Sequence, residues 1–366
     1  MLSTPVVQNS TNGMLRAPAH LTAPIRSAPL YHGGDLAWAE EHYPDAERPW
    51  IDLSTGINPW PYPFAPPPLD AWTRLPAARL DRQLRDAAAT YYGVGDPNAV
   101  AAAPGSQALI QVLPRLRPRG CIAIVMPTYG EYAACWEASG HAVVPIATID
   151  AIPAGCDVVV VANPNNPDGR IVPRDRLVSV AGSLSRRRGW LVVDEAFADT
   201  APQVSLAEDA ARPGLIVLRS FGKFFGLAGL RLGFALAAPR LAGALRTALG
   251  PWAVSGPASW IGARALADTA WIAATRTRLS AEAARLDTLL AEASLPVVGR
   301  SALFRLVETT AAADLFEHLC RRGIFVRHFA EHPSWLRFGL PESDATNERL
   351  RRVLRAWRGE QRRSAR

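Results

Sequence analysis

The sequence has 366 residues, of which 49% are hydrophobic and 20% charged. This balance suits one large and one small domain, each with its own core, and excludes a disordered or fibrous chain. The net charge is +7, and much of the excess lies in the arginine-rich stretch 349–366. We expect a solvated last helix there rather than a nucleic-acid surface.

Neither a membrane span nor a secretory signal is expected. The longest apolar stretches, CIAIVM at 121–126 and DVVVVA at 157–162, are only as long as strands. The first twenty residues lack a continuous apolar run and a charged start. Four widely spaced cysteines, none in a C-x-x-C pair, are interpreted as reduced packing residues of a cytoplasmic protein: Cys121, Cys135, Cys156 and Cys320.

The first part of the chain, residues 1–70, is predicted to be an extended arm. It is rich in proline, and PWPYPFAPPP at 59–68 cannot lie inside a helix or a central strand. From residue 71 onward, helical stretches alternate with apolar strands expected near 99–103, 121–126, 141–147, 157–162, 190–194, 215–219 and 232–237. This alternation predicts an α/β domain with a mostly parallel, seven-stranded sheet covered by helices on both faces.

A smaller α+β domain is predicted to follow the break GPWAVSGP at 250–257. It should begin with one long helical run at 258–293 and end with a helix from about residue 343. Between them lie apolar segments near 302–307, 324–329 and 335–340. The predicted divisions are an arm (1–70), a large domain (71–254) and a small domain (255–366).

In the segment LRSFGKFFGLAGLRLGF at 218–234, Lys223 follows Ser220 by three residues and precedes Arg231 by eight. A deprotonated lysine forms a Schiff base, and nearby cations and burial lower its pKa. The planar guanidinium of an arginine can donate two parallel hydrogen bonds to a phosphate. A glycine-rich turn with an exposed lysine is the alternative. The segment resembles the lysine segment of the fold-type I pyridoxal phosphate (PLP) enzymes, the aspartate aminotransferase superfamily, which implies PLP bound to Lys223, with Ser220 and Arg231 on its phosphate.

Two upstream segments continue this resemblance. VVANPNNPDG at 160–169 is similar to the N-P-N-N-P-T-G segment of histidinol-phosphate aminotransferases, which implies that Asn166 bonds the phenolic oxygen of PLP. WLVVDEAFAD at 190–199 implies that Asp194 pairs with the ring nitrogen and strengthens the ring as an electron sink. Many relatives have tyrosine where this chain has Phe197. On their own, the two motifs could be an Asn-Pro turn and a capping acid.

Two further segments complete a set of five in the expected order over residues 102–234. AAPGSQALIQVL at 102–113 predicts a strand, a turn and a helix, so that Gly105, Ser106 and Gln107 form a phosphate cup. MPTYGEY at 126–132 resembles the segment whose aromatic residue stacks on the PLP ring, which implies that role for Tyr129. A plain helix cap and a surface tyrosine are the alternatives.

The arm narrows the resemblance to the threonine-phosphate decarboxylases. The signature begins with YHGGDLAWAEEHYP at 31–44, runs to residue 63, and is matched again by GIFVRHFAEHPSWLRFGLP at 323–341. The likeness implies that His32, Gly34, Gly56 and Asn58 lie at the substrate end, and that Arg337 binds the substrate's anion. A turn histidine and a strand-edge arginine are the alternatives.

The resemblance therefore implies PLP-dependent decarboxylation of L-threonine O-3-phosphate to (R)-1-aminopropan-2-yl phosphate, a step of cobalamin synthesis. It also implies a cytoplasmic homodimer with the active site at its interface, and no metal, nucleic acid or membrane. Leu75 replaces the tyrosine of the Y-P-D motif, so the usual hydrogen bond to the neighbouring subunit's PLP is not expected. One alternative is a histidinol-phosphate aminotransferase or a related amino-acid aminotransferase. The other is a catalytically silent regulator that binds DNA, but such regulators usually carry a separate helix-turn-helix domain, for which we expect the arm to be too short.

Overall fold

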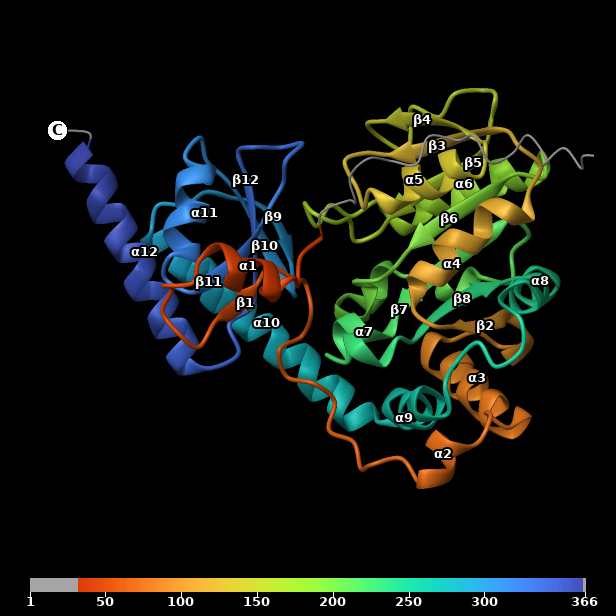
Figure 1. Ribbon diagram of the computed structural model, residues 1–366. Helices are drawn as coiled ribbons and strands as arrows, with labels where there is room; N and C mark the ends of the chain where they lie inside the picture. The colour runs from red at the N-terminus through yellow and green to blue at the C-terminus, as the bar shows by residue number, and fades with distance from the viewer. Residues whose placement is uncertain (1–31, 365–366) are drawn as a thin grey trace, which may run out of the picture. The chain divides into compact units, whose positions relative to one another are not determined.

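The computed structural model describes residues 32–364, so the first 31 residues of the predicted arm lie outside the described residues. Seven strands form the larger sheet in the order β2-β8-β7-β6-β5-β3-β4 (Figure 1). They are β2 (Val100–Ala103), β3 (Cys121–Val125), β4 (Ala142–Ile146), β5 (Cys156–Ala162), β6 (Trp190–Asp194), β7 (Leu215–Ser220) and β8 (Gly233–Ala237). Only β8 runs against its neighbours. The predicted mostly parallel sheet is confirmed.

Helices cover both faces of this sheet, which explains why its strands read as continuous apolar runs. On β5, Val159 faces one core and its neighbour Val160 faces the other, because successive side chains alternate. The first core is completed by α3 (Ala78–Tyr92), α6 (Arg174–Arg186) and α9 (Gly256–Ala267). The second is completed by α4 (Ser106–Val112), α5 (Glu131–Ala138) and α8 (Pro239–Leu249).

The direction of the strands gathers the predicted site residues at one edge. Because β8 is reversed and β2 pairs with its far side, β2 runs in the same direction as the other five strands. Their carboxyl ends therefore share an edge, where open α/β sheets bind their ligands. The residues that end these strands or soon follow them are Gly105, Tyr129, Asn166, Asp194 and Lys223. The reversed β8 brings Arg231 to the same edge from its amino end.

A second sheet has the strand order β1-β11-β12-β10-β9. Its strands are β1 (Ile51–Leu53), β9 (Val297–Ser301), β10 (Phe304–Glu308), β11 (Ile324–His328) and β12 (Trp335–Gly339). Sequence analysis did not predict β1 or β9. The short β1 comes from the predicted arm and pairs in parallel with β11, with Ile51 opposite Ile324. Its three residues carry too short a pattern to be recognised without their partner strand.

The remaining helices are α1 (Leu36–His42), α2 (Leu69–Thr73), α7 (Phe221–Phe224), α10 (Thr269–Glu292), α11 (Ala312–Cys320) and α12 (Asp344–Ser364). The predicted single helical run at 258–293 is wrong, because α9 ends at Ala267 and α10 starts anew at Thr269. Asp268 separates them, and its Oδ1 accepts a hydrogen bond of 2.9 Å from the Trp271 N–H. A side-chain cap of this kind favours a new helix start over continuation.

The cysteines require a correction. Cys121 and Cys156 form a disulfide, so the prediction that all four cysteines are reduced is wrong for this pair. The two residues begin β3 and β5 and lie opposite each other in the register of these neighbouring strands. That adjacency depends on strand order, which a sequence separation of 35 does not reveal. Cys135 and Cys320 are free.

The last helix, α12, carries much of the excess positive charge. Arg351 and Arg355 form ion pairs with Glu292, and Arg352 pairs with Glu47. Acids of other elements therefore neutralise part of this charge. Among residues 32–364, no helix has both the length and the apolar composition needed to span a membrane.

Candidate active site

Lys223 lies on α7, the short helix that directly follows β7, and it is the only lysine in the sequence. Burial of its amine and the positive charges of Arg337 and Arg231 together lower the pKa to about 8, whereas the charge of Asp194 opposes them. Such an amine is partly deprotonated near neutral pH, as a nucleophilic lysine requires.

Asn58 fixes the backbone of the lysine helix. Its backbone N–H donates to the Lys223 carbonyl and its Nδ2 donates to the Phe224 carbonyl, both at 2.9 Å. Its Oδ1 accepts from the Trp60 N–H at 3.0 Å. Asn58, which was predicted to lie at the substrate end, is buried and uses its side chain to bind backbone groups. These hydrogen bonds hold the arm segment against α7.

Asp194 ends β6 as a buried carboxylate beside Lys223. Its Oδ1 accepts from the Ala196 N–H at 2.9 Å, and its Oδ2 accepts from the Tyr132 hydroxyl at 2.5 Å. Burial raises the pKa of Asp194, whereas the two hydrogen bonds and the charges of Lys223 and Arg219 lower it. Sequence analysis missed Tyr132, whose only signal is its place three residues after Tyr129 in MPTYGEY, at the start of α5.

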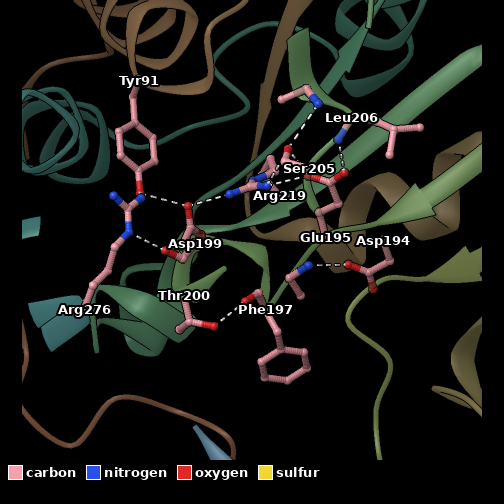
Figure 2. A network of polar contacts seen from close by, with 12 residues as sticks. Tyr91, Asp194, Glu195, Phe197, Asp199, Thr200, Ser205, Leu206, Arg219 and Arg276 are labelled. Carbon is pink, nitrogen blue, oxygen red and sulfur yellow. Dashed lines mark hydrogen bonds and ion pairs between the residues drawn. The ribbon is translucent and has the colours of Figure 1, made fainter. Parts of the chain in front are cut away.

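A buried ion-pair network joins the ends of β6 and β7 (Figure 2). Arg219, which precedes Ser220, donates to Glu195 and Asp199 at 2.5 Å each. Glu195 also accepts from the Ser205 hydroxyl and the Leu206 N–H. Burial alone would lower the pKa of Arg219, but Asp199 and Glu195 raise it well above its ordinary value. The network keeps Asp194 and Ser220 at neighbouring strand ends.

Arg337 on β12 reaches from the smaller sheet to the loop after β5. Its Nη1 donates to Asn166 Oδ1, and its Nη2 donates to the Ser54 carbonyl at 2.9 Å. Its buried Nε has no hydrogen-bond partner, and no acid of the described residues forms an ion pair with it. Because arginine only donates, Asn166 turns its oxygen to Arg337 and keeps Nδ2 as a donor for another group.

A second arginine that sequence analysis missed, Arg327 on β11, lies opposite Arg337 in the strand register. Burial and the charge of Arg327 lower the pKa of Arg337 to about 9, whereas the charge of Asp52 opposes them. Like charges on opposite positions of neighbouring strands are unfavourable unless anions compensate them. A bound anion would add to the compensation that Asp52 gives Arg337. Arg327 could have been noticed in the sequence, because it lies in GIFVRH at 323–328, within the segment 323–341 that resembles the threonine-phosphate decarboxylases.

The predicted phosphate residues meet where β2 and β8 adjoin. Gly105 has φ +84°, and a Cβ there would lie 2.6 Å from Arg231 Nη2. A Cβ on Gly233 would lie 2.4 Å from the Ser106 N–H nitrogen, and Gly233 pairs with Ser220 in the sheet. The glycines thus allow Arg231 and the turn before α4 to approach closely. The result is a small region lined by N–H groups and a guanidinium.

Tyr129 belongs to a chain of polar contacts beside this region. Its hydroxyl donates to Gln107 Oε1 at 3.1 Å, and Gln107 Nε2 donates to Glu131 Oε2 at 3.1 Å. Glu131 Oε1 lies 3.2 Å from His32 Nε2, and the His32 and Tyr129 ring centroids are 5.6 Å apart. The structure therefore brings His32 from the arm to the predicted stacking residue. Glu131, the link between them, was missed.

The two predicted glycines of the arm serve close packing. Gly34 has φ +92°, and its N–H donates to Ser54 Oγ at 2.7 Å. A Cβ on Gly56 would lie 3.0 Å from ring carbons of both Phe197 and Phe304. These contacts bring the arm against the same residues that hold Arg337, whose guanidinium carbon lies 5.1 Å from the Phe304 ring centroid.

Three comparisons with known proteins agree with this geometry. Residues 70–356 match the family model described as aminotransferase class I and II. Threonine-phosphate decarboxylase of Pseudomonas aeruginosa is 47% identical over 89% of this chain and 97% of its own length. The enzyme of the same name from a Sinorhizobium species is 45% identical over 90% and 98%.

A solved structure shows the same fold. The histidinol-phosphate aminotransferase from Sinorhizobium meliloti, in complex with pyridoxal-5'-phosphate, superposes with a TM-score of 0.77 at 24% identity. The match covers 93% of this chain and 99% of that one. Together with the family model and the curated relatives, it confirms the fold-type I assignment. The chain belongs to the aminotransferase class I and II family, and within it to the family of the threonine-phosphate decarboxylases.

Proposed function

We propose that this chain binds PLP on Lys223 and decarboxylates L-threonine O-3-phosphate to (R)-1-aminopropan-2-yl phosphate. The observation that carries this proposal is the buried Arg337, whose charge lowers the pKa of Lys223. Its neighbour across the strands is Arg327, Asp52 compensates its charge only from a distance, and no acid of residues 32–364 forms a direct ion pair with it. The similarity to two curated threonine-phosphate decarboxylases supports the choice of substrate and reaction.

The residues present fit PLP. Lys223 supplies the amine, Asp194 a buried carboxylate for the ring nitrogen, and Tyr129 an aromatic face. Asn166 keeps an amide donor for the phenolic oxygen. Ser106, Gln107, Ser220 and Arg231 would supply donors for the phosphate. The Gly105 N–H already donates to the Ala103 carbonyl at 2.8 Å, so Gly105 would contribute space for Arg231. The close approach of Arg231 to Gly105, which no larger residue would permit, is the observation that supports this cradle.

The substrate class follows from charge. Threonine phosphate carries a carboxylate and a phosphate dianion, and buried anions need paired or hydrogen-bonded cations. Arg337 and Arg327 provide two guanidiniums, and His32 lies beside Tyr129. Holding the departing carboxylate tightly would stabilise the ground state. Arg337 is therefore assigned to the phosphate or to initial docking.

When bound, PLP supplies a conjugated ring that accepts the electron pair left by the departing carbon dioxide. Asp194 contributes by holding a proton at the ring nitrogen, since its charge favours the protonated ring. Lys223 contributes an amine that is free to react once deprotonated. Asn58 keeps the lysine helix in place, and the Arg219 network keeps β6 and β7 aligned beneath both groups.

The proposal includes a homodimer with the active site at its interface and a cytoplasmic location, and retains the divisions 1–70, 71–254 and 255–366. Large apolar side chains are exposed along one stretch of the chain: Leu69, Trp72 and Leu75 are 74%, 65% and 67% exposed. Trp252, 58% exposed, lies shortly before Gly256, which packs against Ala71. Exposed large apolar side chains on and beside α2 support a second copy of this chain as the partner.

One assay tests the function. The purified protein is incubated with PLP and threonine phosphate, and released carbon dioxide and aminopropanol phosphate are measured together. Equal amounts of the two products support decarboxylation. The histidinol-phosphate aminotransferase alternative instead predicts that a 2-oxo acid restores PLP from its pyridoxamine form, with no carbon dioxide. That result would overturn the proposed reaction while leaving the cofactor in place.

A further inference from the structure

We propose that Tyr132 is a positioning residue that keeps Asp194 ionised and oriented toward the ring nitrogen of the cofactor. The inference rests on the PLP part of the proposed function and is independent of the substrate. Tyr132 ends the MPTYGEY segment, from which only Tyr129 was assigned a role, and it is only 1% exposed.

The geometry gives each oxygen of Asp194 one protein donor. The Tyr132 hydroxyl donates to Oδ2 at 2.5 Å, and the Ala196 N–H donates to Oδ1 at 2.9 Å. A carboxylate oxygen has two lone pairs, so each oxygen can still accept a further hydrogen bond. Two donors from different elements, α5 and the turn after β6, fix the plane of the carboxylate.

The tyrosine itself is held rigidly. Its N–H donates to the Tyr129 carbonyl at 3.2 Å, and its ring meets the Tyr129 ring edge-on with centroids 6.1 Å apart. It also packs in the core between the sheet and α4, α5 and α8. The hydroxyl therefore reaches Asp194 from a side chain that has little freedom to move.

Electrostatics shows why this donor matters. Burial favours the neutral acid at Asp194, and Tyr132 provides the foremost of the hydrogen bonds that oppose this effect. The charged groups that act on the carboxylate are Lys223 and Arg219. Burial raises the pKa of Tyr132 well above its ordinary value, so the phenol stays protonated and acts as a donor. Without it, Asp194 would take the proton that the ring nitrogen otherwise holds.

The test compares full-length wild type, Tyr132→Phe and Tyr43→Phe, each loaded with PLP labelled with ¹⁵N in the ring. Tyr43 is the matched control, because its hydroxyl donates to Glu317 at 2.5 Å and Glu317 lies on α11. In Tyr132→Phe, the ring ¹⁵N resonance should move toward the unprotonated value, with proton occupancy of the ring reduced about tenfold or more. Tyr43→Phe should match wild type.

The kinetics of Tyr132→Phe should also show a loss of activity. In Tyr132→Phe, kcat should fall about as much as kcat/KM, because an interaction used in the transition state is lost while binding is retained. A wild-type protein that binds no PLP would refute the proposed cofactor. A Tyr132→Phe protein that binds PLP with an unchanged ¹⁵N resonance would refute the role of Tyr132 alone.

A second variant covers the case in which Tyr132→Phe fails to fold. Site-specific 3-fluorotyrosine at position 132 keeps the hydroxyl and nearly the same size, and its more acidic phenol is a stronger donor. It should raise the pH at which the ring ¹⁵N resonance moves to the unprotonated value, relative to wild type. No shift, or a shift in the other direction, would contradict the inference.

Discussion

At the scale of single residues, the chemistry depends on a few charged groups that are removed from water. Lys223 lies between the positive charges of Arg337 and Arg231 and the negative charge of Asp194. Removing one neighbour should therefore move its pKa in a known direction. Since the sequence contains no other lysine, the behaviour of this amine can be measured without interference from other side-chain amines.

The first prediction concerns pH. The pKa of Lys223 is lowered from 10.5 to about 8, so the free amine is scarce below pH 8 and predominant above it. The rate at which apoprotein forms a borohydride-trappable adduct with PLP should rise through about pH 8 and then level off. Asp194→Asn should move this midpoint downward, because the carboxylate raises the pKa of the lysine.

The measurement is the rate of adduct formation from pH 6 to 10, with peptide mapping of the trapped product. Lys223→Ala is the control and leaves only the α-amino group to react. A pyridoxyl group found mainly on the N-terminus of the wild type, or a rate that does not change with pH, would contradict the assignment.

At the scale of elements, the ends of β6 and β7 are joined by charge as well as by backbone pairing. Glu195 and Asp199 are 0% and 1% exposed and share the guanidinium of Arg219. Tyr92 at the end of α3 adds its ring, 4.5 Å from the Arg219 guanidinium carbon. Removing one partner from such a network leaves buried charges without compensation.

The second prediction follows from this network. Arg219→Met keeps much of the volume but removes the charge, and should destabilise the apoprotein by about 3–5 kcal/mol. The measurement is the free energy of unfolding from denaturant titration. Arg285→Met is the matched control, since Arg285 pairs with the exposed Asp344 and should contribute less than about 1 kcal/mol. Equal losses in the two variants would show that the buried network does not stabilise the strand ends.

At the scale of the whole molecule, two sheets and the arm meet around the substrate end of the site. Arg337 comes from β12, Asn166 from the loop after β5 and Ser54 from the residue after β1. The proposed anion site therefore requires both sheets and the arm segment to be in place. The exposed apolar residues on and near α2 are the surface that the proposed homodimer would bury.

The third prediction separates substrates. Free threonine lacks the phosphate dianion and should be poorer than threonine phosphate by roughly a thousandfold or more in kcat/KM. Arg337→Ala should reduce that preference. Carbon dioxide release is measured from both substrates at saturating PLP, with Arg176→Ala as a surface-arginine control. Equal activity of the wild type on both substrates would refute a phosphorylated substrate, whereas an unchanged preference in the variant would reassign Arg337.

The fourth prediction tests the assembly. Trp72→Glu places a charge on the apolar surface around α2 and should weaken self-association by more than tenfold, measured by sedimentation equilibrium. Ile171→Glu is the control, because Ile171 is 47% exposed but lies in the loop before α6. A wild type that is monomeric at all concentrations would contradict the proposed homodimer.

The sequence by itself determined the larger sheet and the residues along its edge, because both are local. The strands are apolar runs, and Gly105, Tyr129, Asn166, Asp194 and Lys223 each occur in a short motif at a strand end. The family and its fold followed from five such motifs in order. These strands and motifs can be recognised without knowing which segments of the chain are in contact in the folded protein.

The tertiary structure alone decided what depends on segments far apart in the chain. Tyr132 donates to Asp194, which is 62 residues later, and strand register alone places Arg327 opposite Arg337 in the proposed anion site. The pairing of β1 with β11 and the disulfide between Cys121 and Cys156 likewise depend on strand order. Burial decided the pKa of Lys223 and the partners of Arg219, because desolvation is set by the packed chain and leaves no mark in the local sequence.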